Sequence, residues 1–440
     1  MRSRQYFVLL ALHLFACGNS DNTAKPAAKS DAGAKPGDTS HSHETTCFGT
    51  KPLDAYVADP KLCAYIFAEG VSGARQLAFA PNGDLFVSND GKVTVLWDAD
   101  GDGFSSSAER SVFAEAPALN HGIAFSRDHK LLYVSSGTTV YRYSYRSGQR
   151  AAEGGREVVI DGIPTGGHSA RPLAFDSKNR LYVSIGSGGN VDTAPNDIEL
   201  RSQLRRYELP ETLPKGGLTY PDGGEVIATG MRNESGLFVD EQDRLWGVEN
   251  GRDNLSDADL GGDIHNDNPG EEINLIDGQG AKFYGYPSCF SEHTLSGGKG
   301  QGTQWADESL DGTLRKTDEF CSDSKEVHPP AFVMPAHWAP LGIIVYGGRS
   351  LPYTGDLIIG AHGSWNRRPA TGRVVARLKL QGSTVSGLEI ILGQKNSRGE
   401  LTQGSWDVRP VDVREGPDGA IYISDDSGGR VIKLGYKQAN

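Results

Sequence analysis

The stretch that decides the fold is Leu173-Ala174-Phe175, a polar turn over residues 176–180, and Leu181-Tyr182-Val183-Ser184. It decides the fold because the chain repeats this pattern. An apolar triplet, a turn rich in Asp, Asn or Gly, and a strand of β-branched and aromatic residues together predict a short β-hairpin. Five further copies have the same order: Leu77-Ala78-Phe79 with 85–88, Ile123-Ala124-Phe125 with 132–135, Leu237-Phe238-Val239 with 245–248, Ile343-Ile344-Val345 with 357–360, and Val411-Asp412-Val413 with 421–424.

The spacing of these copies predicts how the hairpins assemble. They recur at intervals of about 45 to 70 residues, with one longer interval of about 105, and such intervals are typical of one four-stranded blade per copy. We therefore expect an all-β fold, a six-bladed β-propeller with four-stranded blades over residues 46–440, and a β-sandwich is the alternative. The longer interval predicts an insertion at about residues 252–337.

The N-terminus has the pattern of an export signal. Arg2 and Arg4 precede an apolar run that ends at Ala16 and is too short to span a bilayer. We interpret residues 1–16 as a lipoprotein signal peptide, with Cys17 as the acylated residue, and ordinary secretion is the alternative. Residues 17–45 lack aromatic side chains and predict a flexible tether. The expected location is the bacterial cell envelope, lipid-anchored in the periplasm or outer membrane.

Charge and cysteines narrow the class of protein. The formal net charge of −12 argues against a nucleic acid partner and leaves the lipid anchor as the expected membrane contact. After Cys17 the cysteines form two sequence-local pairs, and of the three possible connectivities the sequence favours Cys47–Cys63 and Cys289–Cys321. No Cys-x-x-Cys-His motif for a covalently attached haem occurs.

Cationic and titratable residues stand just before the repeated copies. In a propeller the innermost strand begins each blade, so these positions are candidates to face a central channel. They are Arg75, His121, His168 with Arg171, Arg232 with Asn233, and Arg409. Guanidinium groups suit carboxylates, so the pattern predicts a channel that binds an anion. The alternative is that each arginine pairs with a nearby aspartate.

An acidic loop in the first copy predicts a calcium site. Asp98, Asp100, Asp102 and Glu109, with Gly103 at the sixth position, match the spacing of a calcium-binding loop. No helices are expected beside it, so the calcium would be structural, and a plain acidic turn is the alternative. The less regular stretch Asp257, Asp259, Asp263 and Asp267 predicts a solvated loop.

Several segments in the right order, over about residues 70–435, resemble the glucose/sorbosone dehydrogenase family of PQQ-dependent soluble aldose dehydrogenase-like propellers, nearest its L-sorbosone dehydrogenase-like branch. They are Gly166–Arg171, Gly230–Gly236, Val248–Asp253, Glu271–Asn274 leading to Tyr284–Pro287, His362–Arg367, and Arg409–Val413. The resemblance implies a six-bladed propeller that binds pyrroloquinoline quinone (PQQ) and calcium.

The resemblance also implies roles for single residues. His168 matches the general base, whose imidazole would remove a hydroxyl proton from the sugar. Arg232, Asn233 and Arg409 match residues that contact the quinone, and the backbone of Gly251 and Arg252 matches a calcium-binding turn. Val411 and His362 stand where the family has an arginine and a lysine, and Arg75 or Arg171 could supply the missing cations.

These residues predict a sugar dehydrogenase of the cell envelope. The expected reaction is PQQ-dependent oxidation of an aldose or related sugar aldehyde, with His168 as base and hydride transfer to the quinone. Because no haem motif is present, a separate cytochrome or quinone would accept the electrons. The alternatives are a non-catalytic propeller that binds glycans or proteins, which Val411 and His362 favour, and, more weakly, a calcium-dependent lactone hydrolase.

Overall fold

The computed structural model describes residues 47–194 and 199–437. The predicted signal peptide, Cys17 and the predicted tether therefore lie outside the described residues. Within the described part, no helix is both long enough and apolar enough to cross a membrane.

The first three blades are antiparallel sheets of strands that succeed one another along the chain. Blade 1 consists of β3 (Ala74–Phe79), β4 (Leu85–Asn89), β5 (Lys92–Leu96) and β6 (Arg110–Glu115). Blade 2 consists of β7 (Leu119–Phe125), β8 (Leu131–Ser136), β9 (Val140–Ser144) and β10 (Glu157–Asp161), with β14 (Leu218–Thr219) parallel to β10. Blade 3 consists of β11 (Leu173–Phe175), β12 (Leu181–Ile185), β13 (Gln203–Tyr207) and β15 (Glu225–Thr229), with β21 (Lys282–Phe283) parallel to β15.

The remaining three blades complete a ring of six. Blade 4 consists of β16 (Glu234–Val239), β17 (Leu245–Glu249), β20 (Glu271–Ile276) and β24 (Phe332–Met334). Blade 5 consists of β25 (Pro340–Val345), β26 (Leu357–Ala361), β27 (Val374–Gln381) and β28 (Thr384–Lys395), with β1 (Tyr56–Val57) and β29 (Leu401–Thr402) paired to β28. Blade 6 consists of β30 (Pro410–Glu415), β31 (Ile421–Asp425), β32 (Arg430–Tyr436) and β2 (Leu62–Glu69). The expected all-β, six-bladed propeller with four-stranded blades is confirmed.

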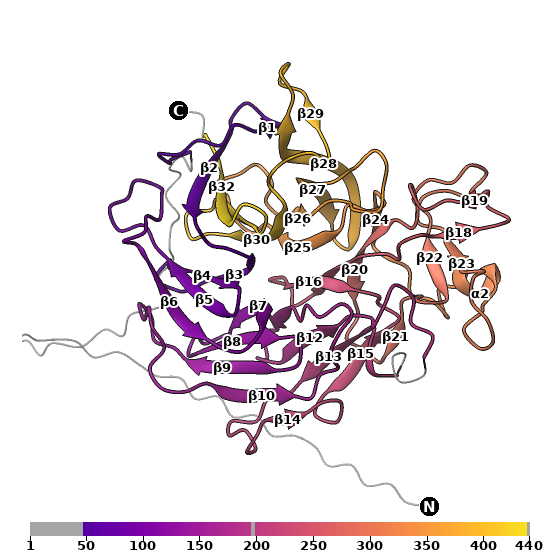
Figure 1. The fold of residues 1–440 in the computed structure, drawn as a ribbon, viewed down its shortest axis with the longest axis horizontal. Coiled ribbons are helices and arrows are strands. Elements are labelled where there is room, and N and C mark those ends of the chain that lie inside the picture. The colour runs from indigo at the N-terminus through magenta and orange to yellow at the C-terminus, as the bar shows by residue number, and fades with distance from the viewer. Residues whose placement is uncertain (1–46, 195–198, 438–440) are drawn as a thin grey trace, which may run out of the picture. The chain divides into compact units, whose positions relative to one another are not determined.

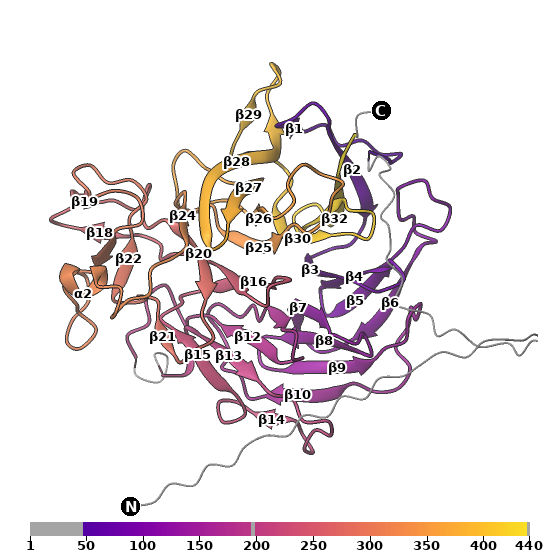
Figure 2. The same cartoon turned by 180° about the vertical axis from the view of Figure 1, so that it is seen from behind.

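The N-terminal strand closes the ring. β2 pairs antiparallel with β32, so the outermost strand of blade 6 comes from the start of the described chain. In Figures 1 and 2 this indigo strand lies beside the yellow C-terminal strands, between blades 5 and 1. A disulfide between Cys47 and Cys63 connects β2 to the segment before it. The favoured pairings are thus both formed in the structure, since Cys289 and Cys321 are also bonded.

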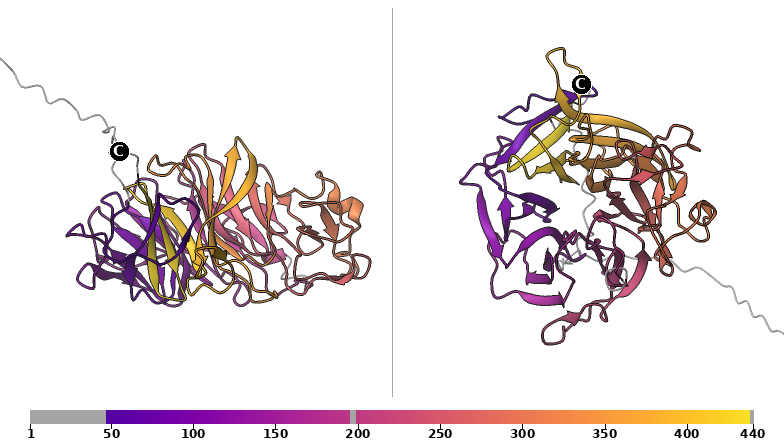
Figure 3. Two further views of the ribbon diagram at one scale, coloured as in Figure 1. Left: turned by 90° about the horizontal axis from the view of Figure 1, so that it is seen from above. Right: turned by 45° about the vertical axis from the view of Figure 1, so that its right-hand side comes forward.

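The innermost strands of neighbouring blades contact one another around the ring in the order β3, β7, β11, β16, β25, β30 and back to β3. The right-hand view of Figure 3 shows the blades arranged about this centre. Apolar side chains pack between blades: Phe86 of blade 1 meets Phe125 of blade 2 edge-to-face at 5.1 Å between ring centroids. The alternation of inward and outward residues along each strand supplies these interblade cores.

The predicted insertion at 252–337 is only partly outside the blades. This span contains β20 and β24, which are the third and fourth strands of blade 4. The true excursions are the hairpin of β18 (Ser256–Asp257) and β19 (Gly262–Asp263), and a unit of β22 (Cys289–Ser291), β23 (Gln304–Ala306) and α2 (Asp318–Ser322). They extend to one side of the ring in Figure 1 and in the left-hand view of Figure 3. Asp257 is buried and not solvated as expected, because its carboxylate accepts the backbone N–H groups of Asp259 and Leu260.

Candidate functional site

The beginnings of the innermost strands and the ends of the second strands meet at one end of the ring, which we call the site face. Antiparallel pairing places them together, because the second strand ends where the first begins. Asn250, directly after β17, donates to the carbonyl of Pro340 at the start of β25, at 2.8 Å. His168 and Arg171 precede β11 at the same face, and Arg409 precedes β30.

A buried serine holds His168 in one tautomer. The hydroxyl of Ser187 lies 2.8 Å from Nδ1 of His168 and 2.7 Å from the carbonyl oxygen of Gly189. The carbonyl can only accept, so the single hydroxyl proton is used there, and Nδ1 must donate its own proton to Ser187. In the neutral imidazole, Nε2 therefore has the lone pair. No residue of the described chain forms a hydrogen bond with Nε2, so this nitrogen is available as a base.

The turn before His168 requires glycine. Gly167 has a φ of +58°, and a Cβ there would lie 2.3 Å from the carbonyl oxygen of Ser187. Only a residue without a side chain lets the two loops approach this closely. Gly167 therefore positions His168 against Ser187.

The surroundings of His168 favour its neutral form. Burial, together with the positive charges of Arg232, Arg171 and Arg201, lowers its pKa from 6.5 to about 4. Both causes disfavour a second positive charge on the imidazole. Near neutral pH, His168 thus has an unprotonated Nε2.

Asn233 lies beside His168. A Cβ on Gly186 would be 2.6 Å from the Cβ of His168 and 2.9 Å from Oδ1 of Asn233, so the two side chains flank this glycine. The side-chain amide of Asn233 donates to Oδ1 of Asn250 at 2.9 Å. The structure therefore brings together His168 and Asn233, which the sequence placed on neighbouring repeats.

A second group of predicted residues meets around an aspartate that sequence reasoning missed. Asp426 comes directly after β31, and its carboxylate lies 2.8 Å from Nη1 of Arg75 and 2.9 Å from Nε2 of His362. Arg409 donates to the carbonyls of His362 and Gly363 at 3.2 and 3.3 Å. Blades 1, 5 and 6 thus converge here.

Two arginines of this group keep donors to spare. Nη2 of Arg75 and Nη1 of Arg409 have no hydrogen-bond partner among residues 47–194 and 199–437. Burial lowers the pKa of Arg409, and the neighbouring Arg373 lowers it further, because the cations repel one another. An anion at this place would relieve that repulsion.

His121 forms hydrogen bonds with both of its ring nitrogens. It is buried, with Nδ1 accepting from Nε of Arg75 at 3.3 Å and Nε2 3.0 Å from the carbonyl of Ser235, to which it donates. Burial lowers its pKa to about 3, with Arg75 as the next cause. Both ring nitrogens are used, so His121 connects blades 1, 2 and 4 as a neutral side chain.

Arg171 donates to the backbone of the turn around His168. Its side chain is fully buried, and its guanidinium donates to the carbonyls of His168, Ala170 and Pro164. Burial lowers its pKa to about 10. In the structure Arg171 thus fixes the turn that contains His168, and its predicted contact with the quinone stays a prediction.

Arg232 offers no free donor either. Its side chain is 4% exposed, and Nε, Nη1 and Nη2 donate to oxygens of Asn190, Asn250, Gly251 and Asp253. All five N–H groups are used. As placed in the structure, Arg232 ties two loops together and does not present the carboxylate-binding fork that the sequence predicted.

The turn expected to bind calcium has a suitable set of oxygens. The carbonyl of Gly251 accepts Nη1 of Arg232 at 2.7 Å, and the Asp253 carboxylate lies 3.2 Å from Nη2 of the same guanidinium. Carbonyl and carboxylate oxygens are the ligands that calcium prefers. The side chain of Arg252, by contrast, pairs with Asp307 outside this set.

The serine that ends the repeated Leu-Tyr-Val-Ser phrase positions the site residues of the next blade. Ser88 donates to the carbonyl of His121, Ser135 to that of Arg171 at 2.7 Å, and Ser424 to that of Arg75 at 2.6 Å. All three serines are buried. These interblade serines explain why the phrase ends in a small hydroxyl residue, a role that the sequence pattern did not disclose.

The acidic loop brings three aspartates together but not the glutamate. One oxygen each of Asp98, Asp100 and Asp102 lies within 4.8 Å of the others. The Glu109 carboxylate instead accepts the N–H groups of Ala99 at 2.7 Å and Ser106 at 3.0 Å, and such bonds lower its pKa to about 2. The three aspartates also accept N–H groups of the loop, but Glu109 is not in the group whose oxygens lie within 4.8 Å of one another.

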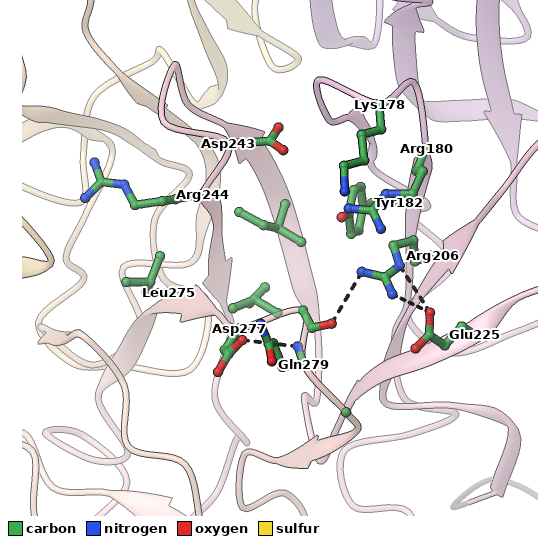
Figure 4. Close-up of a pocket in the computed structure, with 14 residues that line it drawn as sticks. Lys178, Arg180, Tyr182, Arg206, Glu225, Asp243, Arg244, Leu275, Asp277 and Gln279 are labelled. Carbon is green, nitrogen blue, oxygen red and sulfur yellow. Dashed lines mark hydrogen bonds and ion pairs between the residues drawn. The ribbon is translucent and has the colours of Figure 1, made fainter. Parts of the chain in front are cut away.

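The large groove shown in Figure 4 is not part of this site. It has a volume of about 790 Å³ and lies between blades 3 and 4, lined by the turn residues Lys178, Arg180, Asp243 and Arg244. These turns connect first to second strands, so they lie at the opposite end of the ring from His168. Arg206, which also lines the groove, pairs with Glu225, so this wall is internally neutralised.

Relatives in sequence are sugar dehydrogenases that depend on PQQ. A PQQ-dependent sugar dehydrogenase of Hypocrea jecorina (strain QM6a) is 29% identical over 391 residues, which cover 84% of this chain and 86% of the relative. A PQQ-dependent pyranose dehydrogenase of Coprinopsis cinerea is 25% identical, over 82% of this chain and 52% of the relative. The chain thus spans about half of the Coprinopsis protein.

Solved structures agree with these relatives, and a family model covers the whole propeller. The holo PQQ domain of the Coprinopsis cinerea pyranose dehydrogenase has a TM-score of 0.74 at 25% identity, over 88% of this chain and 98% of that one. A calcium structure of a Trichoderma reesei enzyme of carbohydrate-active family AA12 has a TM-score of 0.76 at 26% identity, over 90% and 100%. The TrAA12-like family model matches residues 56–437. These matches confirm the expected family of PQQ-dependent sugar dehydrogenase-like propellers, and the chain belongs to the TrAA12-like family.

Proposed function

We propose that the chain oxidises an aldose or related sugar aldehyde with PQQ as cofactor. The observation that supports this most directly is the tautomer of His168, whose free Nε2 lies at the site face next to Asn233. The names of the Hypocrea and Coprinopsis relatives support the same reaction class. Which sugar is oxidised depends on loops around the site face.

The residues of the site fit an anionic quinone. Arg75 and Arg409 have spare N–H donors, and His362 lies between them through Asp426. We propose that these arginines bind the carboxylates of PQQ, because guanidinium groups match carboxylates in geometry and charge. When bound, PQQ would supply the acceptor for the hydride of the oxidised carbon, which contains both electrons of the oxidation.

His168 is proposed as the general base. Nε2 takes the hydroxyl proton of the substrate, and Ser187 keeps the imidazole oriented while Nδ1 retains its proton. The charge that develops on the imidazole is stabilised by the Ser187 hydroxyl oxygen. The electrons then leave for a separate acceptor, a cytochrome or quinone.

The test is a titration of the purified protein with PQQ and calcium, monitored by absorbance and by sugar-dependent dye reduction. Binding at micromolar PQQ with turnover of an aldose supports the proposal.

A non-catalytic propeller that binds glycans or proteins is the second candidate. This candidate is favoured by the smaller number of cations that can reach an anionic cofactor. Val411, fully buried, stands where the family has an arginine, and Arg171 has no exposed N–H donor. No uptake of PQQ would rule out the proposed enzyme, and glycan or protein binding would then be measured directly.

Ser187→Ala tests how the base is positioned. Without the hydroxyl, Nδ1 loses its acceptor and the imidazole is free to adopt the other tautomer, so kcat is expected to fall about tenfold with KM little changed. Ser187→Thr keeps the hydroxyl and should restore activity. The ¹⁵N chemical shifts of His168 would report the tautomer directly; an unchanged shift pattern in Ser187→Ala would contradict this role.

A structural calcium is proposed at the loop of Asp98, Asp100 and Asp102. Thr50 and Asp102 are 3.5 Å apart, and Gly103 packs against Phe48 and Gly49, so the loop touches the segment next to the closing strand. Calcium at about 1 mM is expected to raise the midpoint of thermal unfolding by about 5 °C. The double variant Asp98→Asn/Asp100→Asn should lose this increase, while Asp222→Asn at a distant turn should keep it. An equal increase in the double variant would disprove the site.

The cellular location is likewise proposed from the sequence. The lipoprotein signal over residues 1–16 and the acylation of Cys17 would place the propeller in the cell envelope. The two disulfides are compatible with an oxidising compartment. Mass spectrometry of the N-terminal peptide would detect the lipid.

A further inference from the structure

Arg232 lies in a cage made entirely of oxygen atoms. Nε donates to the carbonyl of Asn190 at 3.0 Å, and Nη1 donates to the carbonyls of Asn250 and Gly251 at 3.2 and 2.7 Å. Nη2 donates to Oδ1 of Asn190 at 3.0 Å and to the Asp253 carboxylate at 3.2 Å. Five donors thus face five acceptors, and the side chain is 4% exposed.

These acceptors are of the type that binds a hard metal ion. They are three backbone carbonyls, one amide oxygen and one carboxylate oxygen, the usual ligands of calcium. Their side chains and backbone come from two loops, one after β12 and one after β17. Without a cation, four oxygen dipoles and a carboxylate would point at one another in a buried place, which costs free energy.

Calcium and the guanidinium cannot share this cage. The carbonyl of Gly251 is 2.7 Å from Nη1, and a calcium ion on the same oxygen would lie about 2.4 Å away. The two cations would therefore be separated by about 5 Å at most. Asp253 is the one carboxylate that accepts from the guanidinium. Glu249 and Glu271 accept the backbone N–H groups of Arg232 and Gly251, and burial raises the pKa of both carboxyl groups and so favours their neutral forms. Mutual repulsion favours either cation alone.

We propose that Arg232 is the resident cation of this cage and that calcium and Arg232 occupy it as alternatives. In the absence of metal, the guanidinium holds the loops at Asn190 and Gly251 together. Calcium can enter only when Arg232 leaves, and the released side chain then has free N–H donors for an anion. Calcium and an anionic quinone should thus bind cooperatively, a consequence that rests on the proposed function.

The first test uses calcium alone and needs no quinone. In an Asp98→Asn/Asp100→Asn background, which removes the other acidic loop, the protein with Arg232 is expected to bind no calcium at about 1 mM in isothermal titration calorimetry. Arg232→Met in the same background leaves the cage without a cation. It should bind one calcium ion, and its thermal midpoint should rise by about 5 °C or more over that in EDTA.

Arg232→Lys is the matched variant, because it keeps a positive charge with fewer donors. It should bind calcium less tightly than Arg232→Met and more tightly than the parent. If Arg232→Met folds only in calcium, that dependence supports the proposal. If Arg232→Met fails to fold in both conditions, Arg232→Lys decides: no calcium binding by this variant overturns the proposal. Equal calcium binding by the parent and Arg232→Met overturns it as well.

The second test adds PQQ. In the Arg232 protein, calcium is expected to tighten PQQ binding at least tenfold, and PQQ must tighten calcium binding by the same factor. In Arg232→Met this coupling should disappear. If no variant binds PQQ, the proposed function fails, whereas the calcium-only comparison still decides the exchange at Arg232.

Discussion

His168→Ala is expected to bind PQQ with unchanged stoichiometry and to lower kcat by about 10³, the usual contribution of a positioned general base. The substitution removes Nε2, the one nitrogen of this imidazole without a protein partner in the described chain. Cofactor binding should survive, because the spare guanidinium donors belong to Arg75 and Arg409, which bond to Asp426 and to the carbonyls of residues 362 and 363. Absorbance titration measures binding, and stopped-flow reduction of the bound cofactor measures the chemical step.

His129→Asn is the control for this experiment. His129 lies in the turn between β7 and β8 with a φ of +53°, a conformation that asparagine tolerates well. It should leave kcat unchanged.

In the wild type, activity should rise as the pH increases through about 4, where His168 loses its proton, and then stay level toward neutrality. A His168→Ala protein that keeps wild-type turnover would remove the base from the mechanism.

Glu272→Gln is expected to change the pH dependence of stability strongly. Glu234, Glu249, Glu271 and Glu272 are all buried, and none of them has an ion-pair partner within the described ranges. Burial raises the pKa of Glu272 from 4.5 to about 7. The folded state therefore holds a proton that the unfolded chain releases at lower pH.

The sign of the effect comes from this difference. The stabilisation from protonated Glu272 is complete below about pH 4.5 and is lost as the pH rises through about 7. Glutamine stays neutral, so the free energy of unfolding of the variant, relative to wild type, should rise by about 3 kcal/mol between about pH 4.5 and pH 8.

Chemical denaturation in EDTA would measure this shift, since EDTA keeps divalent cations from neutralising the carboxylates. Glu241→Gln, at an exposed turn, is the control and should match the wild type at every pH. A parallel pH profile for Glu272→Gln and wild type would show that Glu272 is ionised in the folded protein.

The fold could be predicted because each repeat contains its own hairpin. The triplet and the Leu-Tyr-Val-Ser phrase became the first and second strands of every blade, as in β11 and β12. The third and fourth strands were harder to predict in blade 4. β20 and β24 are separated from the hairpin and from each other by the excursions, so the pattern around 252–337 had the length of an insertion.

The residue types of the site could be predicted from the sequence, but the hydrogen-bond partners of these residues could not. The sequence shows that Arg171 and Arg232 stand before inner strands, whereas only coordinates show that backbone carbonyls already use their N–H groups. Glu109 has calcium-loop spacing, yet the loop folds so that backbone N–H groups reach its carboxylate first. The spacing of residues shows which of them lie near one another along the chain. It does not show which hydrogen-bond partner each side chain takes in the folded protein.

Ser187 and Asp426 were missed for a different reason. The repeat pattern pointed to residues before each inner strand, while Ser187 and Asp426 lie just after second strands and outside the segments that resemble the family. Antiparallel pairing brings both positions to the same face. The residues directly after each Leu-Tyr-Val-Ser phrase are therefore equal candidates for the site, and they include Ser187, Asn250, His362 and Asp426.

The interblade serines have a consequence for engineering by recombination. Ser88, Ser135 and Ser424 each hold the backbone of a residue that belongs to the next blade. A chimera that exchanges one whole blade with a relative would separate a hydroxyl from the carbonyl it evolved with, at both junctions. Crossovers should therefore be placed in the turn between a first and a second strand, so that each serine travels with its downstream neighbour.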